Sequence, residues 1–358
     1  MQRRTFALAA FAFVPIILNA THATAVQRAF VASYGTSGNT SFGCSLTKPC
    51  RAFSEALGLT SSGGEVIVLD SAGYGPATIS QSVSIIAPAG VHAGISVFAG
   101  SNGIDIPGGG IRVVLRGLSI SGQGGGHGIY VTGNNELTIE RCDIGGMSSN
   151  GIFLDGVSGT VQIRDTVVHD NAANGVMLFG ALSATLDRVS AERNALAGVY
   201  VIDGPLVSMK DGELIRNNRG LEVTNFAALT TRVNGAGMHI SRNNHEGVLA
   251  ITGTGKVFLQ LVRSDVNHNP DGGAVVQASA SAGDVNATFS DNAFAGNGVG
   301  IRIEPPTVGG SASALLVRNV FAEVQSISVF NNGFFGSGGD NSVRVGGAYT
   351  APNFTFSF

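Results

Sequence analysis

Aliphatic positions alternate with other residues in a short phrase that recurs along most of the chain. Each phrase begins with glycine, continues with an aliphatic residue, and carries a second aliphatic residue two positions later. The glycines are Gly128, Gly151, Gly175, Gly198, Gly220, Gly247, Gly273 and Gly300, and they are 22 to 27 residues apart. A repeat of this length predicts a solenoid, in which each coil buries its apolar face against its neighbours.

The two aliphatic positions of the phrase predict two columns of inward-facing side chains, because residues two apart share one face of a strand. The first column is Ile129, Ile152, Val176, Val199, Leu221, Val248, Ala274 and Ile301. The second column is Val131, Leu154, Leu178, Val201, Val223, Ala250, Val276 and Ile303. Further short strands follow in each coil without an amphipathic helix between them. The pattern predicts a right-handed three-faced parallel β-helix, since parallel crossovers prefer that hand.

Polar residues recur at the corners of the predicted coils. Asparagine stands four positions before several glycines, at Asn171, Asn194, Asn243 and Asn269, and predicts a ladder of stacked amides. Basic residues lie near aspartates in the pairs Arg141/Asp143, Arg164/Asp165, Arg188/Asp187, Lys210/Asp211 and Arg263/Asp265. Repetition over five coils favours a structural charge ladder over a catalytic role for any single pair.

Composition agrees with one all-β domain. The chain has 52 glycines, 44% hydrophobic residues and only 13% charged residues, which separates it from disordered chains. The formal net charge is −3, and the three lysines, Lys48, Lys210 and Lys256, form no basic stripe. We therefore expect no nucleic-acid partner.

The N-terminus has the features of an export signal. Arg3 and Arg4 precede an apolar run from Phe6 to Leu18, and Ala23-Thr24-Ala25 is a small-residue cleavage site. The arginine pair leaves the general and twin-arginine export routes both open. A membrane anchor is the alternative, but the run is shorter than the roughly 20 residues that a spanning helix needs. We predict a signal peptide over residues 1–25 and no membrane span after its removal.

A single helical segment precedes the regular coils. In Pro49–Leu57 the side chains of Phe53, Ala56 and Leu57 share one face, so this segment is predicted to cap the open end of the stack. We assign residues 26–64 to the N-terminal cap region and 65–358 to the β-helix, with Glu65–Leu69 as the first strand. The phenylalanines of Ala351–Phe358 are expected to pack across the other end.

The three cysteines are expected to differ in state. Cys44 and Cys50 lie six residues apart in a loop and are predicted to form a disulfide in an oxidising compartment. Metal binding by this pair is the alternative, but two cysteines without a nearby histidine make a poor zinc site. Cys142 is predicted to be a buried thiol.

The predicted register exposes one column of large side chains. If Ile129 and Val131 point inward, then Tyr130, Phe153, Met177 and Tyr200 point outward, followed by Glu222, Leu249, Val275 and Arg302. Thr132 and Asp155 lie beside the column. Such a stripe indicates binding or association. We predict a polysaccharide or protein partner on this surface, with a subunit interface or coverage by a loop as alternatives.

Several motifs together resemble a known group of proteins. They are Cys44, Pro49-Cys50-Arg51-Ala52-Phe53, Tyr74-Gly75-Pro76, Val83–Ile86 and the glycine phrases, in that order. With them the chain resembles the exported right-handed parallel β-helix repeat proteins of bacteria, in the pectate-lyase-like superfamily. The resemblance implies a secreted, periplasmic or cell-surface protein that engages a polysaccharide along one sheet face. It implies no cofactor, and it would imply calcium only if the protein were a lyase.

No catalytic residue follows from the resemblance. Gly126-His127-Gly128 is similar to a polygalacturonase motif, but Glu304 occupies the place of the later lysine and no aspartate pair precedes His127. The lyase motif Arg-x-Pro-x-x-Arg is absent. Were the protein an enzyme, it would be a polysaccharide lyase or glycoside hydrolase. The alternative is a non-catalytic surface or assembly module, including a homo-oligomer, and the scarcity of acidic residues beside Tyr130 favours it.

Overall fold

The computed structural model describes residues 25–279, 283–305, 309–322, 325–329, 334–337, 340–343, 348–349 and 354–355. Apart from Ala25, the predicted export signal lies outside these residues. The predicted packing of the C-terminal phenylalanine side chains lies outside them as well.

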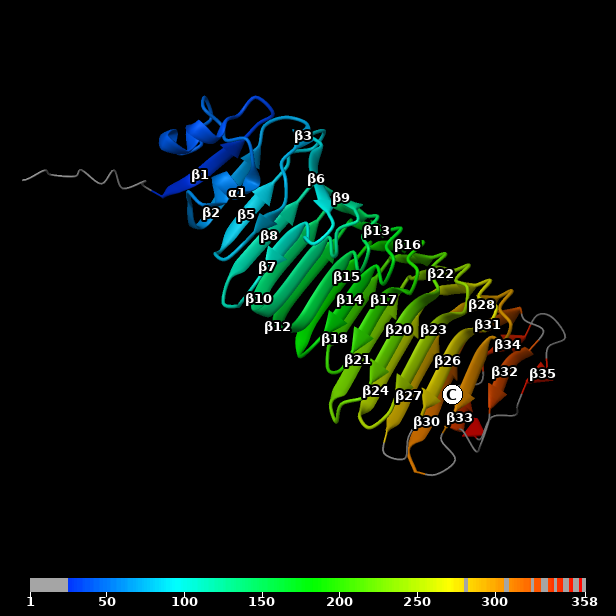
Figure 1. Cartoon of the computed structure of the whole chain (residues 1–358). Coiled ribbons are helices and arrows are strands. Elements are labelled where there is room, and N and C mark those ends of the chain that lie inside the picture. The colour runs from blue at the N-terminus through cyan, green and yellow to red at the C-terminus, as the bar shows by residue number, and fades with distance from the viewer. Residues whose placement is uncertain are drawn as a thin grey trace, which may run out of the picture.

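The described coils form a straight rod of parallel strands (Figure 1). Each coil contributes a strand to each of three faces, which we call the first, second and third face. The first face comprises β4 (Ala77–Thr78), β7 (Ile104–Ile106), the first parts of β10 (Ile129–Glu140) and β12 (Ile152–Arg164), β14 (Val176–Phe179), β17 (Ala197–Ile202), β20 (Arg219–Asn225), β23 (Glu246–Thr252), β26 (Gly272–Ala278), β29 (Ile301–Glu304), β32 (Gln325–Val329) and β35 (Ala348–Tyr349).

The second face continues from the first without a break in β10 and β12. It comprises β1 (Val26–Val31), β2 (Thr60–Val68), β5 (Val83–Ile86), β8 (Arg112–Arg116), the second parts of β10 and β12, β15 (Leu182–Asp187), β18 (Leu206–Lys210), β21 (Thr230–Ala236), β24 (Lys256–Val262), β27 (Asp284–Ser290), β30 (Ser311–Val317), β33 (Phe334–Ser337) and β36 (Phe354–Thr355).

The third face is a separate sheet of short strands. It comprises β3 (Ala72–Gly73), β6 (Ala93–Phe98), β9 (Leu118–Gln123), β11 (Asp143–Gly145), β13 (Val167–His169), β16 (Ser190–Glu192), β19 (Glu213–Ile215), β22 (His239–Ser241), β25 (Asp265–Asn267), β28 (Ala293–Ala295), β31 (Val320–Ala322) and β34 (Ser342–Val343). The architecture is the three-faced parallel solenoid that the repeat predicts.

The inward register is confirmed. Ile129 pairs with Ile152, and Val131 with Leu154, in the parallel ladder between β10 and β12. Both predicted columns are buried from Ile129 to Ile303. Each aliphatic side chain removed from water contributes roughly 1.5–3 kcal/mol, so the columns form the main stabilising core.

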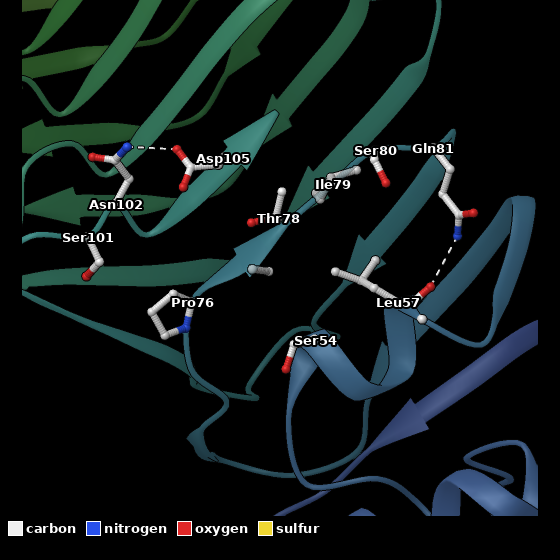
Figure 2. Close-up of a pocket in the computed structure, with 12 residues that line it drawn as sticks. Ser54, Leu57, Pro76, Thr78, Ile79, Ser80, Gln81, Ser101, Asn102 and Asp105 are labelled. Carbon is white, nitrogen blue, oxygen red and sulfur yellow. Dashed lines mark hydrogen bonds between the residues drawn. The ribbon is translucent and has the colours of Figure 1, made fainter. Parts of the chain in front are cut away.

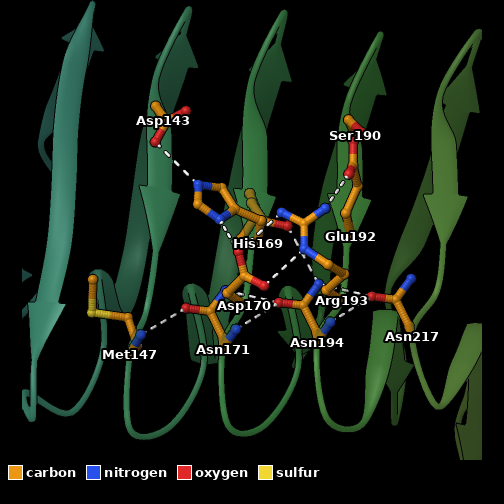
Figure 3. Close-up of polar contacts among 11 residues, drawn as sticks. Asp143, Met147, His169, Asp170, Asn171, Ser190, Glu192, Arg193, Asn194 and Asn217 are labelled. Atoms are coloured by element: carbon orange, nitrogen blue, oxygen red, sulfur yellow. Dashed lines mark hydrogen bonds and ion pairs between the residues drawn. The ribbon is translucent and has the colours of Figure 1, made fainter.

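The asparagine ladder is confirmed, and it includes Asn217 and Asn297 besides the four asparagines that the sequence indicated. Asn171 donates to the Oδ1 atom of Asn194 at 2.8 Å, and Asn194 donates to that of Asn217 at 2.9 Å (Figure 3). Asn217 continues the chain to Asn243 at 3.3 Å, and Asn243 to Asn269 at 3.0 Å. All of these side chains are buried. The ladder therefore satisfies polar groups that would otherwise lie unpaired at the corner.

The charge ladder forms in part, and its short Arg188–Asp165 contact joins one coil to the preceding one, as stacking of the corner charges predicts. Arg188 Nε lies 2.6 Å from Asp165, besides a 2.9 Å contact with Asp187. Lys210 and Asp211 are 3.5 Å apart. The corner residues Arg141, Asp165, Arg188, Asp211 and Arg263 all have left-handed backbone, with φ between 48° and 52°.

Other expected pairs do not form among the described residues. Arg141 approaches Glu140 at 3.6 Å in place of Asp143. No ion pair joins Arg164 to Asp165, or Arg263 to Asp265, in this part of the chain. The observed contacts are solvent-exposed, so each contributes at most about 1 kcal/mol.

Asp143, which the sequence paired with Arg141, contacts a histidine on the third face instead. His169 Nε2 lies 3.2 Å from Asp143, and its Nδ1 lies 2.7 Å from Asp170 (Figure 3). Burial alone lowers the pKa of His169, but the hydrogen bonds to these two carboxylates outweigh it and hold the pKa above its usual value. Hydrogen bonds from Arg193 lower the pKa of Asp170 to about 2. The ion pairs among these side chains are enough to explain the shifted pKa values.

The N-terminal region contains the predicted helix and an unpredicted strand. Helix α1 (Phe53–Leu57) buries Phe53, Ala56 and Leu57, and a 3-10 helix, η1 (Ser37–Phe42), precedes it. Strand β1 pairs with β2 in parallel, so the stack begins at Val26, before the segment expected to be its first strand. In β1 the adjacent residues Gln27 and Arg28 are both exposed, so the alternation of apolar and polar residues that predicts a strand is hard to see there.

Two of the three cysteines are joined. The structure contains a disulfide between Cys44 and Cys50, in the loop between η1 and α1. Cys142 is a buried free thiol whose pKa is raised to about 11 by burial.

Candidate functional site

The four large side chains singled out in the sequence lie in register on the outside of the first face. Tyr130 pairs with Phe153, Phe153 with Met177, and Met177 with Tyr200. All four are half-buried, while the residues on either side of them point into the core. We call this set the strip. Its members follow one another at the strand spacing of about 4.8 Å.

A histidine missed as a site residue completes an aromatic cluster at one end of the strip. The His127 ring lies 5.3 Å from the Tyr130 ring and 5.2 Å from the Phe153 ring. Burial lowers the pKa of His127 and thereby favours the neutral form of the ring. Its Nδ1 atom accepts a hydrogen bond from the amide of Asn150 at 3.3 Å. The sequence drew attention to His127 only through the motif similar to that of polygalacturonases, and only its position just before Gly128 signals its nearness to Tyr130.

Hydroxyl groups fix the orientation of the tyrosine rings. Tyr130 donates to Asp155 Oδ2 at 2.7 Å, a contact that raises the pKa of the phenol. Thr224 donates to the Tyr200 hydroxyl at 3.0 Å. Thr132 accepts a hydrogen bond from the amide of Gly108 at 3.2 Å. Asp155 thus lies beside the strip, where it positions Tyr130, while Thr132 is bonded to the adjacent loop.

The strip continues past Tyr130 into a pocket beside helix α1. Tyr130 pairs with Asp105, and Asp105 pairs with Thr78 in β4. The pocket has a volume of about 590 Å³, and Figure 2 shows side chains of α1 facing those of β4 across it. It is lined by Ser54, Leu57, Gly58, Pro76, Ala77, Thr78, Ile79, Ser80, Gln81, Ser101, Asn102 and Asp105. The sequence pattern did not reveal the pocket, because its walls come from different coils and from the cap.

At the other end, the strip is closed by charged side chains. Arg219 lies 2.9 Å from Glu246 and 3.4 Å from Glu222, the residue next to Tyr200 in the column. Burial raises the pKa of Glu222 above its usual value, although Arg219 opposes this. Glu222 belongs to the column that the sequence predicted, whereas Glu246 was missed because it lies just before the glycine phrase.

Two outward residues of the predicted column are covered. Leu249 is 7% exposed and Val275 is 1% exposed. Arg302 follows Val275 in the column, and its guanidinium reaches back to within 3.8 Å of Glu246 and donates to the carbonyl of Asp271. The Arg302 side chain thus lies across the coil of Val275, and the accessible strip ends near Tyr200 and Glu222.

The described residues show neither a metal cluster nor a membrane helix. They contain no group of three or more histidine, cysteine, aspartate or glutamate side chains arranged to hold a metal ion. Within the same residues, no helix has the length and apolarity of a membrane span. The accessible strip offers ring faces for stacking and a row of hydrogen-bonding groups, which suits binding of an extended polyhydroxylated ligand.

Comparison with known proteins agrees with this architecture. Residues 102–261 match the family model described as right handed beta helix region. This chain is a right-handed parallel β-helix protein. No curated protein is significantly similar to it in sequence.

Solved structures resemble this β-helix protein in fold. The crystal structure of pectate lyase Pel9A is 16% identical, with a TM-score of 0.56, over 86% of this chain and 78% of that one. The GH136 lacto-N-biosidase from Eubacterium ramulus is 11% identical, with a TM-score of 0.55, over 89% and 68%. The mannuronan C-5 epimerase AlgE4 A-module from Azotobacter vinelandii is 15% identical, with a TM-score of 0.51, over 82% and 91%. At these identities the likeness concerns the fold alone.

Proposed function

We propose that the protein binds a carbohydrate chain along the strip. The observation that carries the proposal is the unbroken outward register of Tyr130, Phe153, Met177 and Tyr200, with both tyrosine rings held by hydrogen bonds. Ring faces fixed at regular intervals can stack on successive sugar rings, and nearby hydroxyl and carboxylate groups can bond their hydroxyls. Structural neighbours that act on carbohydrates use the same fold, which supports the proposal by analogy.

We further propose that this binding takes place outside the cytoplasm. The N-terminal sequence pattern of Arg3 and Arg4, an apolar run and a small-residue site supports export. The Cys44–Cys50 disulfide suits an oxidising compartment. The protein would meet its ligand as a secreted, periplasmic or cell-surface binding protein.

The proposal is tested with the double variant Tyr130→Ser/Tyr200→Ser. Each ring supplies about 1 kcal/mol of stacking, so removing both should weaken binding roughly thirty-fold. The melting temperature should change little, because both side chains lie outside the core. Affinity is measured by calorimetry with the glycans that bind in a panel of acidic and neutral polysaccharides.

The matched control is Tyr34→Ser, which removes a tyrosine that is 64% exposed in the loop between β1 and η1. This control should bind like the wild type. Sedimentation velocity distinguishes the alternative of self-association: a wild-type oligomer that dissociates in the double variant would assign the strip to assembly. Wild-type affinity in the double variant would overturn the proposal.

A further inference from the structure

The pocket beside α1 forms a closed end to the strip. Strand β4 is the first strand of the first face among the described residues, and it pairs only with β7. Beyond β4 lies helix α1, whose Ser54 and Leu57 line the pocket opposite Thr78 (Figure 2). A chain that lies on the strip and extends toward the N-terminal end of the rod therefore meets a wall. It cannot continue past the cap along the same face.

The polar groups of the pocket suit sugar hydroxyls. Hydroxyl groups come from Ser54, Thr78, Ser80 and Ser101, which are all exposed. Apolar surface comes from Leu57 and from the other aliphatic residues of the lining. The volume of about 590 Å³ lies within the range of about 300–1,000 Å³ that is typical of small-molecule sites. A pocket with these properties can hold one or two sugar units.

One carboxylate is fixed in position within the pocket. Asn102 donates to Asp105 Oδ1 at 2.7 Å, and the Oδ1 atom of Asn102 accepts a hydrogen bond from the amide of His127 at 2.9 Å. No described residue bonds the Oδ2 atom of Asp105. This oxygen is available to accept a hydrogen bond from a ligand hydroxyl.

The charge of the pocket selects against acidic sugars. Asp105 is the only ionisable residue in the lining, and no arginine, lysine or histidine stands there to neutralise a second carboxylate. Asp155 adds a further negative charge beside Tyr130. A uronate in the pocket would face Asp105 without a compensating cation, and like charges at short distance are costly.

We propose that this pocket binds the terminal unit of a neutral glycan chain, so that the protein recognises chains by their ends. This inference rests on the proposed binding along the strip and specifies its ligand. The strip would hold the units that follow the terminal one, over Tyr130 and Phe153.

The stoichiometry of binding tests recognition of chain ends. Calorimetry uses size-fractionated oligosaccharides of four neutral polymers, α-1,4-glucan, β-1,4-glucan, β-1,3-glucan and β-1,4-galactan, with oligogalacturonate and oligomannuronate as acidic counterparts. For the neutral series that binds, we expect one protein per chain at every length, because each chain has one end of the recognised kind. Binding along the interior would give more proteins per chain as chains lengthen.

Substitution at the pocket provides the second arm. Thr78→Trp places a large side chain at an exposed pocket position and should weaken binding at least tenfold. Ser80→Trp should do the same, and it keeps the test decisive if Thr78→Trp fails to fold. The control is Thr185→Trp, at an exposed strand threonine on the second face, and it should bind like the wild type.

The outcomes separate this inference from the proposal on which it rests. If Thr78→Trp and Ser80→Trp bind normally while Tyr130→Ser/Tyr200→Ser does not, the pocket inference is wrong and the strip remains the binding surface. A stoichiometry that rises with chain length, tighter binding of the oligouronates, or no binding of any neutral series would also overturn the neutral chain-end inference. If neither the pocket variants nor Tyr130→Ser/Tyr200→Ser changed the affinity, both the pocket inference and the proposed binding along the strip would be overturned.

Discussion

Val201→Asp is expected to lower the free energy of unfolding by several kcal/mol, roughly 4 or more. Val201 is fully buried between Leu178 and Val223, its partners in the coils before and after it. The substituted carboxylate would face aliphatic side chains, with no cation or donor in its column. Urea denaturation followed by circular dichroism measures the loss.

Tyr200→Ser is the matched control for this prediction, one residue earlier and on the outside of the same strand. It removes a half-buried ring and its contact with Thr224, which should cost about 1 kcal/mol or less. If Tyr200→Ser proved more damaging than Val201→Asp, the inward and outward register of the first face would be wrong.

Asn217→Leu should lower the free energy of unfolding by a similar amount, in this case because buried polar groups lose their hydrogen-bond partners. Asn217 is fully buried and accepts hydrogen bonds on its Oδ1 atom from the amide and the side chain of Asn194, at 2.9 Å each. Its own side chain donates to the carbonyl of Ala191 at 2.9 Å. Leucine would leave the amide of Asn194 and the carbonyl of Ala191 unpaired at about 1–3 kcal/mol each, so we expect a loss of roughly 2–6 kcal/mol.

Asn218→Ala, at the neighbouring residue, is the control that distinguishes loss of the ladder from a general effect of replacing an asparagine. Asn218 is half-buried, and its side chain makes no hydrogen bond to any described residue. It should change the free energy of unfolding by less than about 1 kcal/mol. Equal effects of Asn217→Leu and Asn218→Ala in thermal and urea unfolding would contradict the role of the ladder.

The sequence predicts the coil well because each coil repeats the same local rules. The alternation after each glycine determines which residues point inward, and the 22- to 27-residue spacing brings equivalent residues together. Tyr130, Phe153, Met177 and Tyr200 could therefore be placed on one surface. The asparagine ladder follows from the same repetition.

The remaining features depend on contacts between coils that do not follow the repeat. Arg302 reaches back across Val275 toward Glu246, because its long side chain extends beyond the strand spacing. The pocket combines α1 with β4 and the residues around Asp105, which no periodicity relates. Strand β1 was missed because it belongs to the least regular part of the chain.

Hydroxyl-radical footprinting with mass spectrometry is the most direct test of the claim that the strip binds carbohydrate. With a bound glycan at saturation, the account predicts reduced oxidation at Tyr130, Met177 and Tyr200, and unchanged oxidation at the exposed Phe42 and Phe98. Unchanged oxidation of the strip under saturating glycan would contradict the account, as would protection confined to another exposed site such as Phe226.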